Sequence, residues 1–236
     1  MDRKHGYIPA LRFHWLTPAY DAVVRLTTRE RRFKRTLIEQ AGLSQGQRVL
    51  DLACGSGTLA ILVKRRFPDI EMLGIDGDPA ILARARRKAL SAGTDIGFEL
   101  GFSHELPFPD GHFDCVMSSL FFHHLGYEDK GRAIREILRV LKPGGQVHVA
   151  DWGRPANGAM RLLYLPIQWL DGFANTQENA DGKLMPLFES IGFVNVHEHD
   201  HFNTLFGTLR LFGAAKTSAP RSGYSGDCGV SDSTQG

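Results

Sequence analysis

Residues 49–60, which read V-L-D-L-A-C-G-S-G-T-L-A, constrain the fold of this chain more than any other stretch. A short apolar run ends in closely spaced glycines, and residues 58–66 are rich in good helix formers. This order predicts a strand, a tight loop and a helix. Because glycines let the loop backbone pass close to a ligand, the unit is typical of a nucleotide-type cofactor site.

The segments that follow alternate between the two kinds of element. We expect strands at residues 48–53, 71–76, 97–101, 113–119 and 146–150, and helices at 58–67, 79–92 and 131–141. The last strand is expected after a turn at residues 142–145. Since each crossover between parallel strands needs a helix to return the chain, this predicts an α/β, Rossmann-like, doubly wound and mostly parallel sheet. Ligands of such sheets bind at the carboxyl ends of the strands.

The last third of the chain is expected to complete the sheet. Residues 152–185 predict a cap on the substrate side; they include a strongly apolar segment at 160–170 and a polar segment before a helix at 183–191. Residues 193–199 and 204–214 predict two strands joined by a short turn. As an antiparallel C-terminal hairpin, they would bring the sheet to seven strands.

The expected domain, residues 43–216, is flanked by two smaller parts. Residues 1–42 predict an irregular arm and, from Pro18 to Gly42, a helix. This unit is expected either to be a lid over the site or only to cover one face of the sheet. Residues 217–236 are rich in Ser, Gly and Asp without an apolar period, so we expect a disordered tail.

Composition excludes several classes of partner. The net charge is +2 and the basic residues are spread through helices, so a nucleic acid is not expected as substrate. The three cysteines are far apart and odd in number, which indicates neither a disulfide framework nor a zinc site, and we expect no metal in the site. Neither a signal peptide nor a bilayer-length apolar run is recognisable. We therefore expect a cytoplasmic protein without stable membrane insertion, as monomer or homodimer.

The glycine motif alone leaves two cofactors open. Gly55-x-Gly57-x-x-Ala60 satisfies the dinucleotide fingerprint, so an NAD(P)-dependent oxidoreductase is one alternative. Asp51, however, is expected near the mouth of the site, where a carboxylate repels a pyrophosphate and attracts a cation. S-adenosylmethionine carries an ammonium and a sulfonium and has no phosphate. Asp76, expected at the end of the next strand on the ribose hydroxyls, fits both cofactors.

Four segments in order resemble one family. V-L-D-L-A-C-G-S-G is similar to motif I of the class I S-adenosylmethionine-dependent methyltransferases, and G-I-D-G-D-P to the segment after it. L-P-F-P-D-G-H-F-D and L-K-P-G-G resemble the regions before the fourth and fifth strands. Within the class, the chain most resembles the UbiE-like branch of ubiquinone and menaquinone C-methyltransferase relatives. The resemblance covers residues 47–151.

The resemblance implies a set of cofactor-binding residues. It places Asp51 near the methionine amino group, Asp76 on the ribose, and Tyr20 over the cofactor. The remaining positions implied around the cofactor are Ala53, Cys54, Gly55, Ser56 and Gly57 in the loop, Gly77 after the ribose acid, Phe102 and Ser103 after the third strand, and Ser119 and Leu120 after the fourth.

Some of these positions have a second interpretation or depart from the family. Cys54 is expected to be a small filler rather than a reactive thiol. Asp78, before Pro79, is expected to cap a helix. Phe102 stands where the family places an acid for the adenine, and Gly77 where it places an apolar residue. We hypothesise that Phe102 packs on the purine and so supplies the apolar contact that Gly77 cannot.

The expected reaction is in-line methyl transfer to a small, apolar or aromatic acceptor, with S-adenosylhomocysteine as product. Positioning and exclusion of water can supply much of the catalysis, and a base is needed only for a protonated acceptor. His123 and His124, directly after the fourth strand, are the candidates, with His104 a weaker third. Either histidine of the pair can instead be structural. A non-catalytic S-adenosylmethionine-binding protein remains a second alternative.

Overall fold

The structure, a computed structural model, describes residues 30–218, apart from the side chain of Asp171. Its helices are α2 (Glu30–Gln40), α3 (Thr58–Arg66), α4 (Pro79–Ser91), the 3₁₀ turn η1 (Phe122–His124), α5 (Tyr127–Val140), α6 (Gly158–Leu163), α7 (Leu165–Asp171), α8 (Phe173–Ala180) and α9 (Leu184–Ile191). Its strands are β1 (Arg48–Leu52), β2 (Glu71–Asp76), β3 (Gly97–Leu100), β4 (Phe113–Ser119), β5 (Leu141–Trp152), β6 (Phe193–Thr204) and β7 (Gly207–Lys216).

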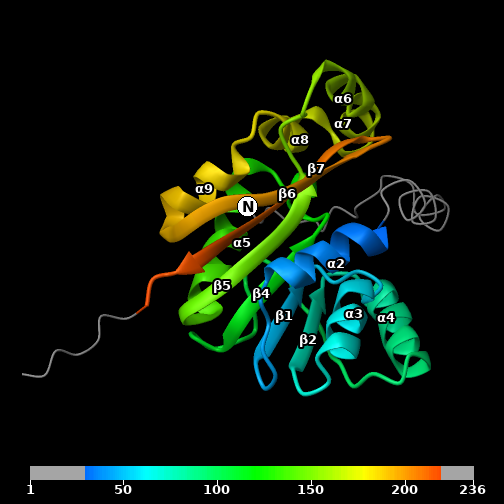
Figure 1. The fold of residues 1–236 in the computed structure, drawn as a ribbon, viewed down its shortest axis with the longest axis vertical. Coiled ribbons are helices and arrows are strands. Elements are labelled where there is room, and N and C mark those ends of the chain that lie inside the picture. The colour runs from blue at the N-terminus through cyan, green and yellow to red at the C-terminus, as the bar shows by residue number, and fades with distance from the viewer. Residues whose placement is uncertain (1–29, 219–236) are drawn as a thin grey trace, which may run out of the picture.

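Within residues 30–218, the strands form one seven-stranded sheet in the order β3-β2-β1-β4-β5-β7-β6 (Figure 1). The first five strands of this order pair in parallel. Strand β7 lies antiparallel between β5 and β6. The doubly wound sheet with an antiparallel C-terminal hairpin, expected from the alternation of elements, is therefore confirmed.

Helices cover both faces of the sheet. On one face, Phe33 and Leu37 of α2 and Val63 of α3 belong to a core cluster with alternate residues of the strands. On the other face, Ile134 of α5 and Phe188 of α9 belong to a second cluster. Because side chains alternate along a strand, each central strand supplies both clusters, and the sheet is buried on both sides.

Several boundaries differ from expectation. The hairpin strands run over Phe193–Thr204 and Gly207–Lys216 instead of residues 193–199 and 204–214. Helix α5 begins at Tyr127 rather than at residue 131, since Gly131 lies inside the helix instead of before it. The turn at residues 142–145 lies within β5: the pairing with β4 passes from Phe113↔Leu141 directly to Cys115↔Gln146. The intervening residues bulge out of the ladder, where Gly144 adopts a positive φ of 78°.

The region between β5 and α9 is helical. The apolar segment 160–170 forms α6 and α7, which meet at Tyr164, just before Pro166 in the first turn of α7. The segment expected to be merely polar before residue 183 is helix α8, with Thr176 and Asn179 buried. Among the described residues, no helix is both long and apolar enough to cross a membrane. The expected arm, Tyr20 and most of the tail lie outside the described residues.

Candidate functional site

The glycine loop joins β1 to α3 at the carboxyl edge of the sheet. Gly55 and Gly57 have φ values of 53° and 71°, and Ala53 reaches 55° although it carries a side chain. The left-handed conformation is costly for a residue with a Cβ, so the loop holds Ala53 in a strained backbone. The Cys54 N–H donates to the Ile75 carbonyl at 3.0 Å, which ties the loop to the end of β2.

Asp51 is a buried carboxylate beneath this loop. Its Oδ2 accepts a hydrogen bond from the Ala60 N–H at 3.1 Å, in the first turn of α3. Its Oδ1 is buried and has no hydrogen-bond partner among the described residues. Burial raises the pKa of Asp51 to about 7, although the charge of Lys34 acts in the opposite direction. A buried, unpartnered carboxylate oxygen is suited to a cationic ligand, because a cation offsets the free energy lost when the carboxylate leaves water.

Asp76 holds the loop from the end of β2. One carboxylate oxygen accepts from the Gly55 N–H at 2.9 Å and the other from the Asp78 N–H at 3.0 Å. Burial raises the pKa of Asp76 above its ordinary value. Since each carboxylate oxygen accepts more than one hydrogen bond, Asp76 retains capacity for two hydroxyls. Gly77, the next residue, is half-buried at the same edge.

Two further expectations near the loop can be compared with the structure. Cys54 is buried against Phe98 in a small cluster, and burial raises the pKa of its thiol, as expected for a filler. Asp78 caps α4 as expected: its Oδ1 accepts from the Ala80 and Ile81 N–H groups at 2.8 and 3.3 Å.

The ends of β3 and β4 carry the other expected contacts. Phe102 is 45% exposed after β3, and its ring stacks on His104 at 5.7 Å. Ser103 follows it in the same loop. After β4, Ser119 is half-buried, and Leu120 has a φ of 57° with its N–H bound to the Ala150 carbonyl at 2.8 Å. The carboxyl ends of β1 to β4 thus bring the expected residues to one edge of the sheet (Figure 1).

A buried histidine–carboxylate pair lies at the same edge. His123 Nδ1 is 2.6 Å from Asp151 Oδ1, and both side chains are about fully buried. The other oxygen, Oδ2, accepts from the backbone N–H groups of Phe121 and Phe122 at 3.0 and 2.6 Å. Burial alone would raise the pKa of Asp151, but His123, the charge of His124 and the Trp152 N–H hold it below its ordinary value. An ionised Asp151 accepts the Nδ1 proton and leaves Nε2 as the basic nitrogen.

The structure separates the other candidates. His124 is half-buried, and its ring lies 4.0 Å from that of His123. Phe122 and Tyr164 are fully buried core residues; Phe122 packs on Phe188 and Tyr164 on Trp152. Trp169, by contrast, is 78% exposed on α7.

Two residues of this region were not found from sequence. Lys34 is a buried cation on α2 that acts on the charge of Asp51. In the sequence, Lys34 could have been noticed as a lysine within the apolar stripe of a helix that includes Phe33 and Leu37. The second residue, Asp151, follows the expected fifth strand, just as Asp76 ends the second. A carboxylate at that edge was therefore a detectable signal.

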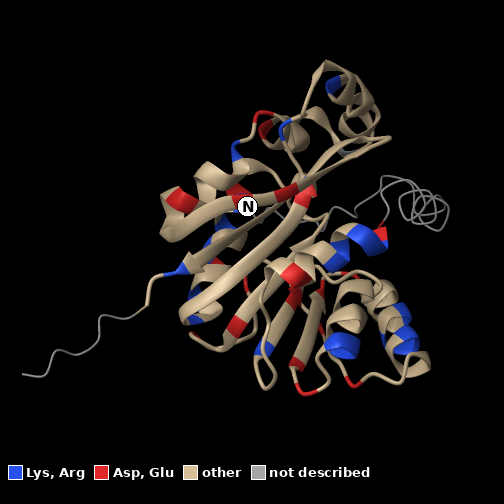
Figure 2. Ribbon diagram, in the orientation of Figure 1, with Lys and Arg blue, Asp and Glu red and all other residues tan. Residues whose placement is uncertain are grey.

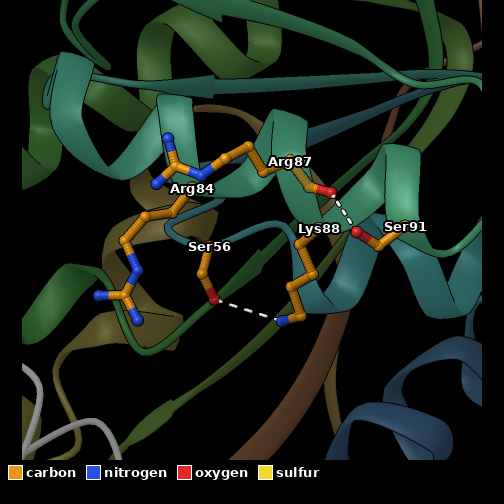
Figure 3. A pocket seen from close by; sticks show the side chains of 5 residues that line it. All are labelled: Ser56, Arg84, Arg87, Lys88 and Ser91. Carbon is orange, nitrogen blue, oxygen red and sulfur yellow. Dashed lines mark hydrogen bonds between the residues drawn. The ribbon is translucent and has the colours of Figure 1, made fainter.

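A separate cavity of about 400 Å³ opens beside the loop. It is lined by Ser56, Arg84, Arg87, Lys88 and Ser91 (Figure 3). Lys88 Nζ donates to Thr58 Oγ1 at 2.5 Å and so fastens α4 to the start of α3. Lys and Arg also gather on the outer sides of α2, α3 and α4 (Figure 2). Cations in its lining make this cavity unsuited to the ammonium and sulfonium groups of S-adenosylmethionine.

Comparisons with known proteins agree with this geometry. Residues 49–145 match the family described as "Methyltransferase domain". The chain is 38% identical over 154 residues to a demethylmenaquinone methyltransferase of Thermus thermophilus, which covers 64% of this chain and 69% of that protein. It is 36% identical over 157 residues to a ubiquinone/menaquinone biosynthesis C-methyltransferase UbiE of Pseudomonas entomophila, but spans only 60% of its length.

Solved structures agree on the fold. The YcgJ protein of Bacillus subtilis superposes with a TM-score of 0.65 at 18% identity, over 79% of this chain and 98% of that protein. At this identity the likeness shows the fold alone. The sequence relatives show the family and with it the cofactor and reaction. The chain belongs to the UbiE-like class I S-adenosylmethionine-dependent methyltransferases, and it is an enzyme that uses S-adenosylmethionine as methyl donor.

Proposed function

We propose that this methyltransferase acts on a small hydroxylated aromatic ring of the quinol type and methylates a ring carbon, with His123 as general base. The observation that carries the proposal is the buried His123–Asp151 pair at the carboxyl edge of the sheet. The names of the relatives, a demethylmenaquinone methyltransferase and a ubiquinone/menaquinone C-methyltransferase, support the acceptor class.

The charged residues beneath and beside the loop fit the cofactor. Asp51 Oδ1, buried and without a partner among the described residues, is proposed to accept the methionine ammonium. Lys34, whose charge acts on Asp51, is proposed to attract the methionine carboxylate. Asp76 is proposed to accept the ribose hydroxyls. The loop from Ala53 to Gly57 with Gly77, Phe102, Ser103, Ser119 and Leu120 is proposed to complete the surroundings; Tyr20, also proposed, lies outside the described residues.

When bound, S-adenosylmethionine supplies a methyl group on a sulfonium whose departure needs no acid. The chain must therefore only orient the acceptor, exclude water and remove a proton. Asp151 keeps the Nδ1 proton of His123 in place, so that Nε2 takes the proton of an aromatic hydroxyl. Loss of this proton puts negative charge on the neighbouring ring carbon, which makes that carbon the nucleophile for the methyl group. The carbon–methyl bond would form as the sulfur–methyl bond breaks and S-adenosylhomocysteine leaves, after which the methylated carbon gives up its own proton and the oxygen regains one.

The cap is consistent with an apolar acceptor. Leu162, Leu165, Trp169 and Phe173 are exposed on α6, α7 and α8. Lys130 of α5 donates to the Asn175 carbonyl at 2.6 Å and so anchors α8 beside η1. Exposed apolar side chains on the cap, one of whose helices contacts the turn that carries His123, favour an aromatic ring over a charged substrate.

The test compares His123→Gln and Asp151→Asn with His124→Gln, which alters the neighbouring histidine. With a 1,4-naphthalenediol that lacks the ring methyl, we expect kcat to fall by about 10²–10⁴-fold in the first two variants, because a positioned base contributes that much. The affinity for S-adenosylmethionine, measured by calorimetry, should stay unchanged.

Three outcomes would contradict the proposal. Full activity in His123→Gln would show that no base is needed there, and loss in His124→Gln alone would identify the other histidine. Methylation of amines or thiols, with no turnover of the diol by the native enzyme, would show that the acceptor class is wrong. Circular dichroism of each variant checks that the buried substitutions leave the fold intact.

A further inference from the structure

We propose that His148, His197 and His199 form a binding site for a divalent transition-metal ion such as Zn²⁺, Ni²⁺ or Cu²⁺. The three residues lie on β5 and β6, on the sheet face that α2 covers. The site shares no residue with the proposed methyl-transfer site. Neutral imidazole nitrogens are the ligands that these metals favour.

The strand register brings two of the histidines together across a glycine. His148 on β5 pairs with Gly213 on β7, and Gly213 pairs with His197 on β6. Directly paired residues project from the same face, so two imidazoles flank a position without a side chain. A Cβ at Gly213 would lie 3.0 Å from both His148 Nδ1 and His199 Nε2. The space above Gly213 is thus faced by two ring nitrogens.

A β-bulge turns the third histidine toward the same space. The pairing of β6 with β7 passes from Glu198↔Phe212 to Asp200↔Leu211, which leaves His199 as the extra residue. Bulges re-aim side chains in this way. The His199 ring lies 4.1 Å from that of His197 and 6.1 Å from that of His148.

Hydrogen bonds select the tautomers that a metal needs. His148 Nε2 is 3.0 Å from Gln146 Oε1, an acceptor, so Nε2 carries the proton and the lone pair lies on Nδ1. This lone pair faces Gln40 Nε2 at 3.4 Å, a long contact whose place a metal ion would take. His197 Nδ1 is 2.7 Å from the Asn195 carbonyl, which leaves the lone pair on Nε2. Metal-ligating histidines usually donate their other N–H to such an acceptor.

The end of α2 adds an oxygen at the same place. Gln40 Nε2 lies 3.4 Å from His148 Nδ1 and donates to the Phe212 carbonyl at 3.3 Å. Gln40 Oε1 is buried and has no hydrogen-bond partner among the described residues. A metal-bound water would satisfy this oxygen. The carbonyl end of the helix also favours positive charge.

The site is not fully closed in the structure. In the described ranges, no three ligating side chains already converge as a metal centre. His148 and His199 face one point, whereas His197, which is exposed, must turn its ring toward it. Two or three histidines with water then complete the four-coordinate arrangement that Zn²⁺ prefers.

The test is calorimetric titration of the full chain with Zn²⁺ and Ni²⁺. His148→Ala and His199→Ala are compared with His201→Ala, which removes an exposed histidine of the same strand that pairs with Arg210. We expect each of the first two variants to bind at least about tenfold more weakly, because loss of a direct ligand should weaken binding at least as much as loss of an outer-shell partner. His201→Ala should bind as the native chain does.

A second readout is electron paramagnetic resonance of the Cu²⁺-loaded protein, which should show coordinated nitrogens, one fewer in His199→Ala. Native protein that binds no metal, or equal binding by His199→Ala, would overturn the proposal. Because His199 is exposed, its substitution decides the question even if His148→Ala, checked by circular dichroism without metal, does not fold.

Discussion

At the scale of a single residue, the proposed contact of Asp51 with the methionine ammonium should make cofactor binding depend on pH. Burial raises the pKa of Asp51 to about 7 in the folded protein, from an ordinary value of 3.8. Only the ionised form attracts an ammonium. We therefore expect the Kd for S-adenosylmethionine to fall as pH rises, by up to about tenfold per pH unit below pH 7, and to level off above it.

Asp51→Asn is the control for this prediction, since it keeps the shape and cannot ionise. The variant should bind S-adenosylmethionine more weakly by about 1.5–3 kcal/mol at high pH, the range for a hydrogen bond to a charged group. Its pH dependence should retain only the titration of the ligand. Calorimetry over a pH series measures both. A native profile identical to that of Asp51→Asn would mean that Asp51 does not contact the cofactor.

The raised pKa of Asp51 also makes the stability of the ligand-free protein depend on pH. A carboxyl whose folded pKa is raised stabilises the fold below its unfolded pKa and loses that stabilisation as pH rises through the folded value. The ligand-free native protein should therefore lose stability relative to Asp51→Asn as pH rises from about 4 to above 7. A buried carboxylate with one unpartnered oxygen thus opposes folding at the pH where its proposed role promotes binding, a common conflict at functional sites.

At the level of the element, helix α4 connects the cofactor loop to the sheet through its cap. Asp78 accepts two backbone N–H groups of its first turn, and Asp76 accepts the N–H of Asp78. Asp78→Ala should lower the free energy of unfolding by about 1 kcal/mol, the usual value of an N-cap. Urea denaturation measures it.

Asp95→Ala is a matched substitution, because Asp95 is exposed and lies after α4 rather than at its start. It should change the stability by less than about 0.5 kcal/mol. Equal effects of the two substitutions would show that the cap does not stabilise α4. Because α4 also fastens the loop through Lys88 and Thr58, we expect Asp78→Ala to weaken cofactor binding only slightly.

At the scale of the whole molecule, cofactor binding should raise the free energy of unfolding. The loop, β1, β2 and β4 meet at one edge of a continuous sheet, so a ligand at that edge contacts several elements at once. S-adenosylmethionine at a hundredfold excess over Kd should stabilise the fold by about 2.7 kcal/mol. Thermal denaturation with and without the cofactor tests this. NAD(H) at the same concentration is the control, and an equal shift would contradict the selectivity expected of Asp51.

The sequence by itself determined the elements and the kind of site. Strands and helices can be predicted locally, because their patterns depend on neighbouring residues. Their alternation along the chain then predicts a parallel sheet. The strand–loop–helix unit at residues 49–60 and Asp76 indicate a nucleotide-type cofactor, and Asp51 favours S-adenosylmethionine over a dinucleotide, because a carboxylate attracts a cation and repels a pyrophosphate. The start of α5 was predicted wrongly at Gly131, because a glycine within a helix and one before it look alike in sequence.

Only the tertiary structure decided which distant groups meet. Asp151 orients His123, and Lys34 acts on Asp51, because the strand order places β5 beside β4 and α2 across the sheet. Histidines on β5 and β6 gather above Gly213 through a register and a bulge that no local pattern encodes. Local preferences depend on neighbouring residues, whereas such contacts depend on how strands far apart in the chain pair. The tertiary structure therefore decided which groups act on His123 and on Asp51.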